Sequence, residues 1–165
     1  MILVGLGGNL PSVAGDALAT CRAALKVLPQ MGITVRAVSP WYRSAPHPPS
    51  DQPWFVNGVA LVSSKLPAHG LLAELHKVEA QFGRERSVAN AARTLDLDLL
   101  AYDDQIHADG VVVPHPRMQD RAFVLKPLAT LAPAWRHPIL KKTATELLAL
   151  LPQDQGVEAL PSQES

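Results

Sequence analysis

The order in which two apolar periodicities follow one another most constrains the fold of this chain. Short apolar or alternating runs indicate β-strands, whereas apolar residues spaced three and four apart indicate helices. These patterns predict strands at residues 2–6, 33–42, 55–63 and 95–102, and helices at 13–28 and 67–82. The first six elements therefore follow in the order β-α-β-β-α-β.

That order is typical of an α+β, ferredoxin-like βαββαβ fold, in which an antiparallel sheet carries helices on one face. Additional C-terminal helices are expected at 123–131 and 143–151. The length favours one domain, expected at 1–158, followed by a flexible tail at 159–165.

Local signals predict how several elements begin and end. Ser12 is expected to cap the first helix, and Gly83 is expected to end the second. The run Gly5-Leu6-Gly7-Gly8-Asn9-Leu10 starts like a dinucleotide fingerprint but has Leu10 in place of its last glycine, so a tight turn is expected at Gly7, Gly8 and Asn9. Four prolines within 45–53 exclude a helix and a central strand, and predict an exposed, stiff loop.

Composition excludes several classes of protein. Hydrophobic residues make up 47% of the chain and charged residues 18%, a composition that suits a packed core. The net charge is zero, so the chain lacks the basic excess that is typical of proteins that bind nucleic acids or anionic membranes. The single cysteine, Cys21, allows no internal disulfide and is expected to be buried. No signal peptide or membrane span is expected, and a cytoplasmic monomer fits best.

Asp96 and Asp98 are the strongest candidates for a chemical role. They lie two residues apart in an apolar strand, so both carboxylates are expected on one face of the sheet. Such a pair can bind hard cations, and Mg²⁺ usually takes one or two protein carboxylates together with phosphates and waters. An ordinary solvated strand face would show the same alternation, and the pattern alone does not decide between the two.

Arginines surround this strand in the sequence. Arg84, Arg86 and Arg93 precede it, while Arg117 and Arg121 follow the turn that contains His115. The planar guanidinium group suits phosphate, because it donates two parallel, charge-assisted hydrogen bonds. Each arginine alone could simply be solvated, but five near one acidic strand indicate a phosphate ligand.

Other residues are candidates for binding a flat heterocycle. Phe55 and Asn57 share one strand face, where an aromatic ring and an amide can stack on and hydrogen-bond to a nitrogenous ring. Glu79 lies at the edge of the apolar stripe of its helix, so it faces either a cleft or solvent. The histidines show no helical metal spacing, and no zinc site is expected.

Together these residues resemble the bacterial 6-hydroxymethyl-7,8-dihydropterin pyrophosphokinases of folate synthesis. The resemblance extends from the glycines near residue 5 to about Pro133. It is carried by Tyr42-Arg43-Ser44, Asp51-Gln52-Pro53, Gly83-Arg84-Glu85-Arg86, Arg93-Thr94-Leu95-Asp96-Leu97-Asp98 and Val113-Pro114-His115-Pro116-Arg117-Met118.

The resemblance implies transfer of the pyrophosphoryl group of ATP to a hydroxymethyl dihydropterin, with release of AMP. It implies that Asp96 and Asp98 bind two Mg²⁺ ions and act in catalysis with Arg84 and Arg93. The nucleotide-binding residues that it implies are Glu79, Arg84, Arg86, Arg93, His115 and Arg121. The pterin-binding residues that it implies are Ser44, Ala45, His47, Phe55, Asn57 and Phe123.

The sequence departs from the family just before the Arg-Thr-Leu motif. Asn90-Ala91-Ala92 stands where the family often has a tryptophan-containing stretch, and the loop is about one residue shorter. Altered loop closure, weaker substrate binding or a modified pterin substrate is therefore expected. Two alternatives are a paralogue that acts on a different hydroxymethyl pterin and a non-catalytic ligand-binding module. The paired aspartates argue against the second alternative.

Overall fold

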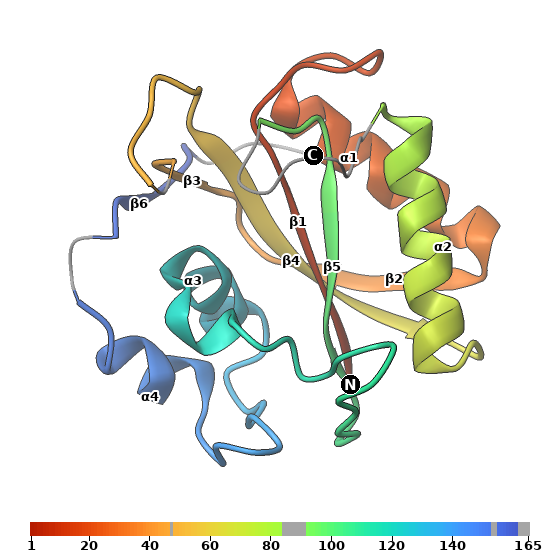
Figure 1. The fold of residues 1–165 in the computed structure, drawn as a ribbon, viewed down its shortest axis with the longest axis vertical. Coiled ribbons are helices and arrows are strands. Elements are labelled where there is room, and N and C mark those ends of the chain that lie inside the picture. The colour runs from red at the N-terminus through yellow and green to blue at the C-terminus, as the bar shows by residue number, and fades with distance from the viewer. Residues whose placement is uncertain (47, 84–91, 153–154, 162–165) are drawn as a thin grey trace.

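The computed structural model describes residues 1–46, 48–83, 92–152 and 155–161, and its elements follow the predicted order with additions (Figure 1). The strands are β1 Ile2–Gly8, β2 Ile33–Val38, β3 Tyr42–Ser44, β4 Phe55–Ser64, β5 Asp96–Tyr102 and β6 Val157–Ala159. The α-helices are α1 Ala17–Val27, α2 Ala68–Gln81, α3 Ala122–Leu131 and α4 Ala144–Ala149. Two 3₁₀ turns complete the elements: η1 Leu28–Met31 follows α1, and η2 Met118–Asp120 precedes α3.

The strands form one antiparallel sheet. Its order is β5-β1-β4-β3-β6, and β2 pairs with β4 beyond the end of β3. The arrangement β5-β1-β4-β2 confirms the predicted ferredoxin-like fold. No helix in the described part of the chain is long and apolar enough to cross a membrane.

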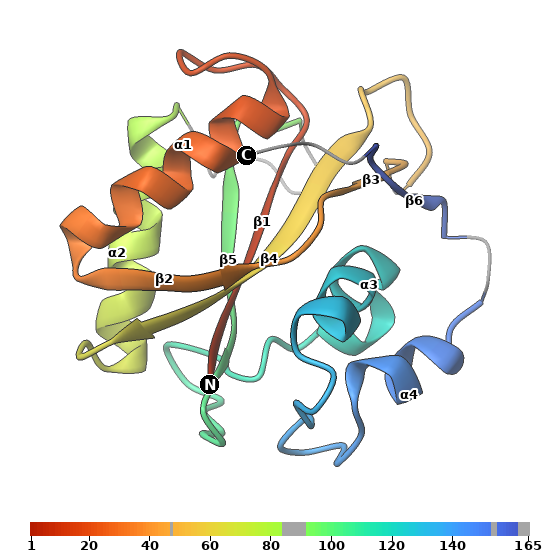
Figure 2. The ribbon, with the colours of Figure 1, turned by 180° about the vertical axis from the view of Figure 1, so that it is seen from behind.

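Helices cover both faces of the sheet, so the expectation of helices on one face holds for the two helices of the βαββαβ unit and does not extend to the additional C-terminal helices. Helices α1 and α2 pack on one face, and α3 and α4 pack on the other (Figures 1 and 2). The first core contains Leu71, Leu75 and Leu97, and the second contains Leu100 and Leu128. Because strand side chains alternate between faces, one strand supplies leucines to both cores.

Several predicted boundaries were also wrong. Asp16, not Ser12, caps α1, because the Asp16 carboxylate accepts a hydrogen bond of 2.8 Å from the Ala19 N–H. The predicted strand at 33–42 is two strands, β2 and β3, separated by Ser39, Pro40 and Trp41. Proline has no N–H to donate to a sheet ladder, and it ends the first strand here.

Glycines near the N-terminus lie in a strand rather than in the expected tight turn. Strand β1 continues through Gly7 and Gly8. A Cβ on Gly8 would lie 2.6 Å from the Thr94 carbonyl oxygen, which is too close for any other residue. The glycine therefore allows the backbones of the segments that follow β1 and precede β5 to lie in contact.

The C-terminal segment is ordered beyond the predicted domain boundary at 158. Val157–Ala159 form strand β6 on β3, and the Leu160 N–H donates to the Trp41 carbonyl oxygen at 3.0 Å. Residue 159, which was assigned to a flexible tail, is therefore part of the sheet. The backbone of an edge strand can recruit such a segment even when its side chains are polar.

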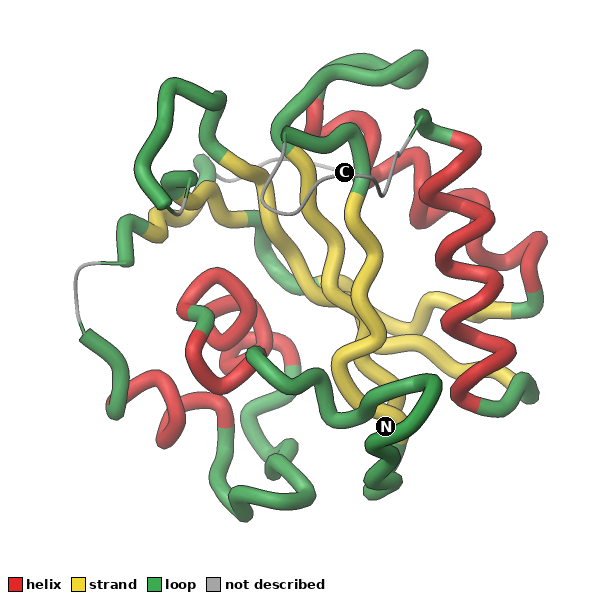
Figure 3. Tube along the Cα trace, in the orientation of Figure 1, coloured by secondary structure: helices red, strands yellow, loops and turns green. Residues whose placement is uncertain are grey.

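Three loops gather at one end of the sheet. These loops follow β1, precede β4 and precede β5, and Figure 3 shows them side by side at the end opposite the N-terminus. The strand residues nearest to them include Gly7, Asn57 and Asp96, which are register partners across neighbouring strands. The fold thus brings the candidate residues of distant segments to one edge.

Candidate active site

A cavity of about 740 Å³ opens at this end of the sheet, on the face that α3 covers. The candidate residues that line it are Ser44, Ala45, Phe55, Asn57, Arg93, Asp96, Asp98, Arg117, Arg121 and Phe123. Its volume lies in the usual range for small-molecule sites. The sequence-predicted phosphate-binding and heterocycle-binding residues therefore share one pocket.

Strand β1, which contains Gly7, lies between the strand that carries the phosphate-binding candidates and the strand that carries the heterocycle-binding candidates. Gly7 pairs with Asn57 of β4 on one side and with Asp96 of β5 on the other. A Cβ on Gly7 would lie 3.2 Å from the Asn57 Oδ1 atom. The missing side chain therefore leaves room for a ligand to lie across β1.

Asp96 and Asp98 both face the cavity, as their spacing predicted, while Leu97 between them is fully buried on the other face. Arg93 Nη1 donates to Asp96 Oδ2 at 3.0 Å, and the two side chains are only 18% and 20% exposed. The Arg93 guanidinium carbon also lies 5.9 Å from the centre of the Phe55 ring. The site thus pairs its negative charge with a cation beside an aromatic surface.

Arg121 enters the cavity from the start of α3. Its guanidinium carbon lies 5.4 Å from the centre of the Phe123 ring. Burial lowers the pKa of Arg121 from its ordinary value, and the Asp98 carboxylate opposes that shift. Partial burial of this cation strengthens its attraction for an anionic ligand, since less water screens it.

His115 is held at the edge of the site and is neutral. Its N–H donates to the Leu100 carbonyl oxygen at 2.8 Å, and its ring Nδ1 accepts from the Arg117 N–H at 3.1 Å. Burial, and then the Arg121 cation, lower the pKa of His115 to about 4. Because Nδ1 accepts a hydrogen bond, the ring proton lies on Nε2, which can donate to a ligand. His115 lines an adjoining smaller cavity rather than the main one.

The heterocycle-binding candidates include a hydrogen-bonded polar pair and two aromatic rings that line one cavity. Asn57 Nδ2 donates to Ser44 Oγ at 2.7 Å, and both residues are buried. Phe55 of β4 and Phe123 of α3 line the same cavity. The arrangement presents hydrogen-bonding edges together with apolar ring faces.

Glu79 faces neither a cleft nor solvent, so that prediction was wrong. It is 1% exposed, and its Oε2 atom accepts a hydrogen bond of 2.7 Å from the Leu97 N–H. Leu97 lies between the two aspartates, so Glu79 supports the strand that carries them. The residue does not line the cavity.

Three predicted site residues, His47, Arg84 and Arg86, lie outside the described residues, as does most of the loop that departs from the family. Asn9 is a residue that the sequence interpretation missed. Its amide donates to Gln52 Oε1 at 3.1 Å and to the Pro53 carbonyl at 3.0 Å, and its Oδ1 accepts from the Arg93 N–H at 2.8 Å. An asparagine directly after two glycines was the available signal.

The sequence of this chain is similar to those of known enzymes. A 2-amino-4-hydroxy-6-hydroxymethyldihydropteridine pyrophosphokinase of Pseudomonas aeruginosa is 42% identical over 161 residues, covering 97% of this chain and 96% of the relative. An enzyme of the same name from Synechocystis is 41% identical over 148 residues, covering 88% of this chain and 73% of the relative.

A solved structure shares the fold. It is the crystal structure of wild-type Plasmodium falciparum HPPK-DHPS with pteroate, with a TM-score of 0.69 and 12% identity. The match covers 90% of this chain but 43% of that longer chain. The family model described as 7,8-dihydro-6-hydroxymethylpterin-pyrophosphokinase matches residues 3–133. The chain therefore belongs to the 7,8-dihydro-6-hydroxymethylpterin-pyrophosphokinase family.

Proposed function

We propose that the protein transfers the pyrophosphoryl group of ATP to the hydroxymethyl oxygen of 6-hydroxymethyl-7,8-dihydropterin and releases AMP, as a step of folate biosynthesis. Family membership supports the reaction. The observation that carries the proposal is a single cavity lined both by paired carboxylates with arginines and by a buried amide with two aromatic rings. Those two sets of residues suit a triphosphate and a pterin.

The pterin is proposed to lie between Phe55 and Phe123. The buried Asn57–Ser44 pair then faces the donor and acceptor edge of the ring. Ala45 adds wall at the adjoining loop, where His47 was also predicted to contact the ring. A site built to hydrogen-bond a ring discriminates strongly against analogues without those groups, because its buried polar atoms are left unpaired.

The triphosphate is proposed to lie over Asp96 and Asp98, with two Mg²⁺ ions between them. The donor set fits, since Asp96 and Asp98 both face the cavity with oxygen ligands. Two carboxylates are what Mg²⁺ usually takes when phosphates and waters complete its octahedron. Bound Mg²⁺ supplies charge neutralisation to the phosphates during transfer.

The remaining charge is proposed to fall to arginines. Arg93 and Arg121 line the cavity together with the aspartates, and His115 offers a neutral N–H donor near Arg121. Arg84 and Arg86 are proposed to add phosphate contacts. Glu79 was predicted to contact the nucleotide, but its burial favours support of β5.

The chemistry requires little of the side chains beyond placement. The hydroxymethyl oxygen attacks the β-phosphorus, the bond from that phosphorus to the oxygen shared with the α-phosphate breaks, and AMP leaves with that oxygen. No described side chain is assigned as the base, and the hydroxyl proton passes to solvent. Holding the reactants in line and neutralising charge are the main contributions.

One assay tests the proposal. The protein is incubated with ATP, Mg²⁺ and 6-hydroxymethyl-7,8-dihydropterin, and AMP and pterin diphosphate are quantified. Equal amounts of both products are expected. AMP formation only with another hydroxymethyl pterin would identify a paralogue, and tight pterin binding without AMP would identify a binding module. A cytoplasmic monomer that binds neither nucleic acid nor membrane remains part of the proposal.

A further inference from the structure

The segment from Gln155 to Ala159, here called the C-terminal strap, closes the side of the cavity where the pterin is proposed to bind. It lies beyond residue 133, where the family match ends. Gln155, Gly156 and Val157 all line the cavity. The strap therefore belongs to the site in space although it is remote from the matched motifs in sequence.

The strap is attached to the sheet at the strand that carries Ser44. Ser44 pairs with Val157 and Arg43 pairs with Glu158, so β6 continues the sheet beyond β3. The Ala45 N–H donates to the Gly156 carbonyl oxygen at 3.1 Å. These bonds place the strap directly beside the pterin half of the cavity.

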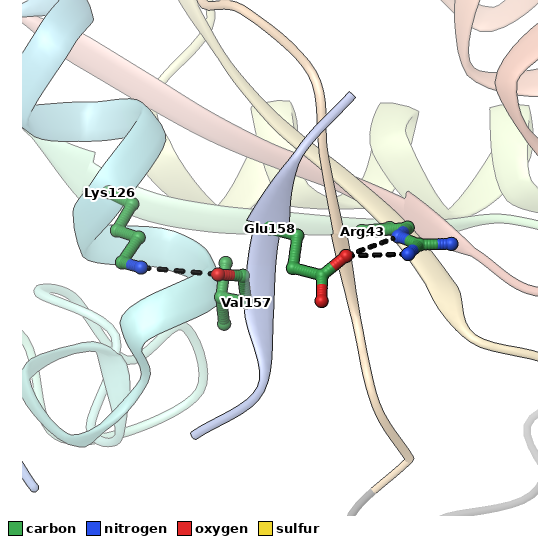
Figure 4. A network of polar contacts seen from close by, with 4 residues as sticks. All are labelled: Arg43, Lys126, Val157 and Glu158. Atoms are coloured by element: carbon green, nitrogen blue, oxygen red, sulfur yellow. Dashed lines mark hydrogen bonds and ion pairs between the residues drawn. The ribbon is translucent and has the colours of Figure 1, made fainter. Parts of the chain in front are cut away.

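The strap is also attached to α3, which lies on the opposite side of β6 from β3 (Figure 4). From α3, Lys126 Nζ donates to the Val157 carbonyl oxygen at 3.2 Å. From β3, Arg43 Nε donates to Glu158 Oε2 at 2.9 Å (Figure 4). Figure 4 shows the strap between these two contacts, with the helix on one side and β3 on the other. The strap thus spans the two walls that hold the proposed pterin site.

Gln155 makes the contact with the greatest consequence. Its Oε1 atom accepts the Ala122 N–H at 2.8 Å, and its Nε2 donates to the Asp120 carbonyl oxygen at 3.1 Å. Arg121 is the N-cap residue of α3 but makes no capping hydrogen bond with its own side chain. The first N–H groups of a helix lack partners within it, so Gln155 supplies a cap from a distant segment.

Phe123 follows Ala122 directly and is one of the two rings proposed to flank the pterin. Resting on the proposed function, we infer that Gln155 is a positioning residue that holds the start of α3, and with it Phe123, at the distance from Ser44 and Asn57 that a pterin ring requires. The strap is then the third wall of the pterin site, between β3 and α3.

The test compares variants at Gln155 with one elsewhere on the strap. Gln155→Met keeps the length of the side chain but removes both hydrogen bonds, and Gln155→Glu keeps the acceptor for the Ala122 N–H. For Gln155→Met we expect the KM for the dihydropterin to rise about tenfold and the KM for ATP to change less than about twofold. Gln155→Glu is expected to restore most of the pterin affinity.

The matched control is Glu158→Gln, on the same strap. Its ion pair with Arg43 is half exposed, with side chains 53% and 51% exposed, so both KM values should stay within about twofold of wild type. Hydrogen exchange at the Ala122 amide gives a second readout that needs no substrate. The exchange rate should rise about fivefold in Gln155→Met, since the capping bond is lost.

Faster exchange at Ala122 with an unchanged pterin KM would overturn the inference, because the cap would then position nothing. An equal rise of both KM values would also overturn it, since that indicates general loosening. If the wild-type protein forms no AMP with any pterin, the proposed function fails instead. Binding of 6-hydroxymethylpterin, followed by its own fluorescence, then decides: a Kd raised by Gln155→Met supports the strap, and an unchanged Kd overturns it.

Discussion

Single side chains at the start of β5 concentrate the charge of this site. Asp96 and Asp98 face the cavity, Arg93 neutralises the first of them, and Glu79 holds the backbone of Leu97 between them from the opposite face. The same strand thus has a charged, ligand-facing side and a buried, supported side. Because the charged side chains lie on the ligand-facing side of the strand, a substitution there should change activity without changing the fold.

Asp98→Ala is expected to abolish AMP formation, with a loss of at least about a hundredfold in kcat, because one carboxylate of the proposed Mg²⁺ pair is removed. Circular dichroism should show an unchanged fold. Asp104→Ala, an exposed residue in the turn after β5, is the control and should retain activity. Turnover by the Asp98 variant close to that of wild type would contradict the metal assignment.

His115 predicts a dependence of stability on pH. Its pKa is about 4 in the folded protein, below the ordinary value of 6.5, so the unfolded chain binds more protons between these values. Its contribution to stability is therefore complete above pH 6.5 and is lost as the pH falls toward 4. His115→Gln should lower the slope of unfolding free energy against pH in this window by up to about one proton. Urea unfolding at a series of pH values measures it, and an unchanged slope would contradict the assignment.

The ends of helices and strands depend on glycines and capping residues whose roles local sequence patterns predict only in part. The expected tight turn after residue 6 is instead the end of β1, because Gly8 lies against the backbone before β5. Conversely, α1 starts at Asp16 because that carboxylate reaches an N–H of the first turn. Propensity names the candidates for such roles, but neighbouring segments decide among them.

Two glycine substitutions should have opposite effects. Gly8→Ala is expected to lower the free energy of unfolding by at least about 1–3 kcal/mol and to impair turnover, because its Cβ would meet the Thr94 carbonyl oxygen at 2.6 Å. Gly70→Ala, within α2, should raise that free energy by about 0.5–1 kcal/mol, since the nearest atom to its Cβ is Pro67 Cδ at an ordinary 3.5 Å. Thermal and urea unfolding measure both. Equal effects at the two positions would contradict the close approach at Gly8.

The molecule is a sheet between two helical layers, α1 with α2 and α3 with α4. The cavity lies at one end of the sheet, on the face that α3 covers. The proposal of a single domain depends on whether these layers unfold together. Leu97 and Leu100 of one strand enter different cores, so neither core can form fully without that strand. This shared sheet favours one cooperative transition.

Leu71→Ala in the first core and Leu128→Ala in the second should each cost about 2–5 kcal/mol, because both side chains are fully buried. Trp41 packs against the first core, and Trp135 belongs to the second. Single-tryptophan variants that retain one or the other should therefore report the same urea midpoint in each mutant. Separate midpoints for the two probes would contradict a single cooperative unit.

The sequence by itself determined the order of the elements, the α+β class and the placement of Asp96 and Asp98 on one face. These properties follow from local periodicity, which is written in neighbouring residues. The run from Arg93 to Asp98, together with the motifs around Ser44 and His115, also indicated the family. Such features need no knowledge of which segments meet in space.

Only the tertiary structure decided what depends on contact between distant segments. The second helical layer, the burial of Glu79 and the role of Asn9 between three loops all arise from side chains that meet across the fold. The polar segment 155–159 gave no periodic signal, yet backbone pairing with β3 makes it a wall of the cavity. Backbone hydrogen bonds at a sheet edge do not depend on side-chain type. For that reason the pairing of this segment with β3 could not be predicted from the sequence pattern and is seen only in the tertiary structure.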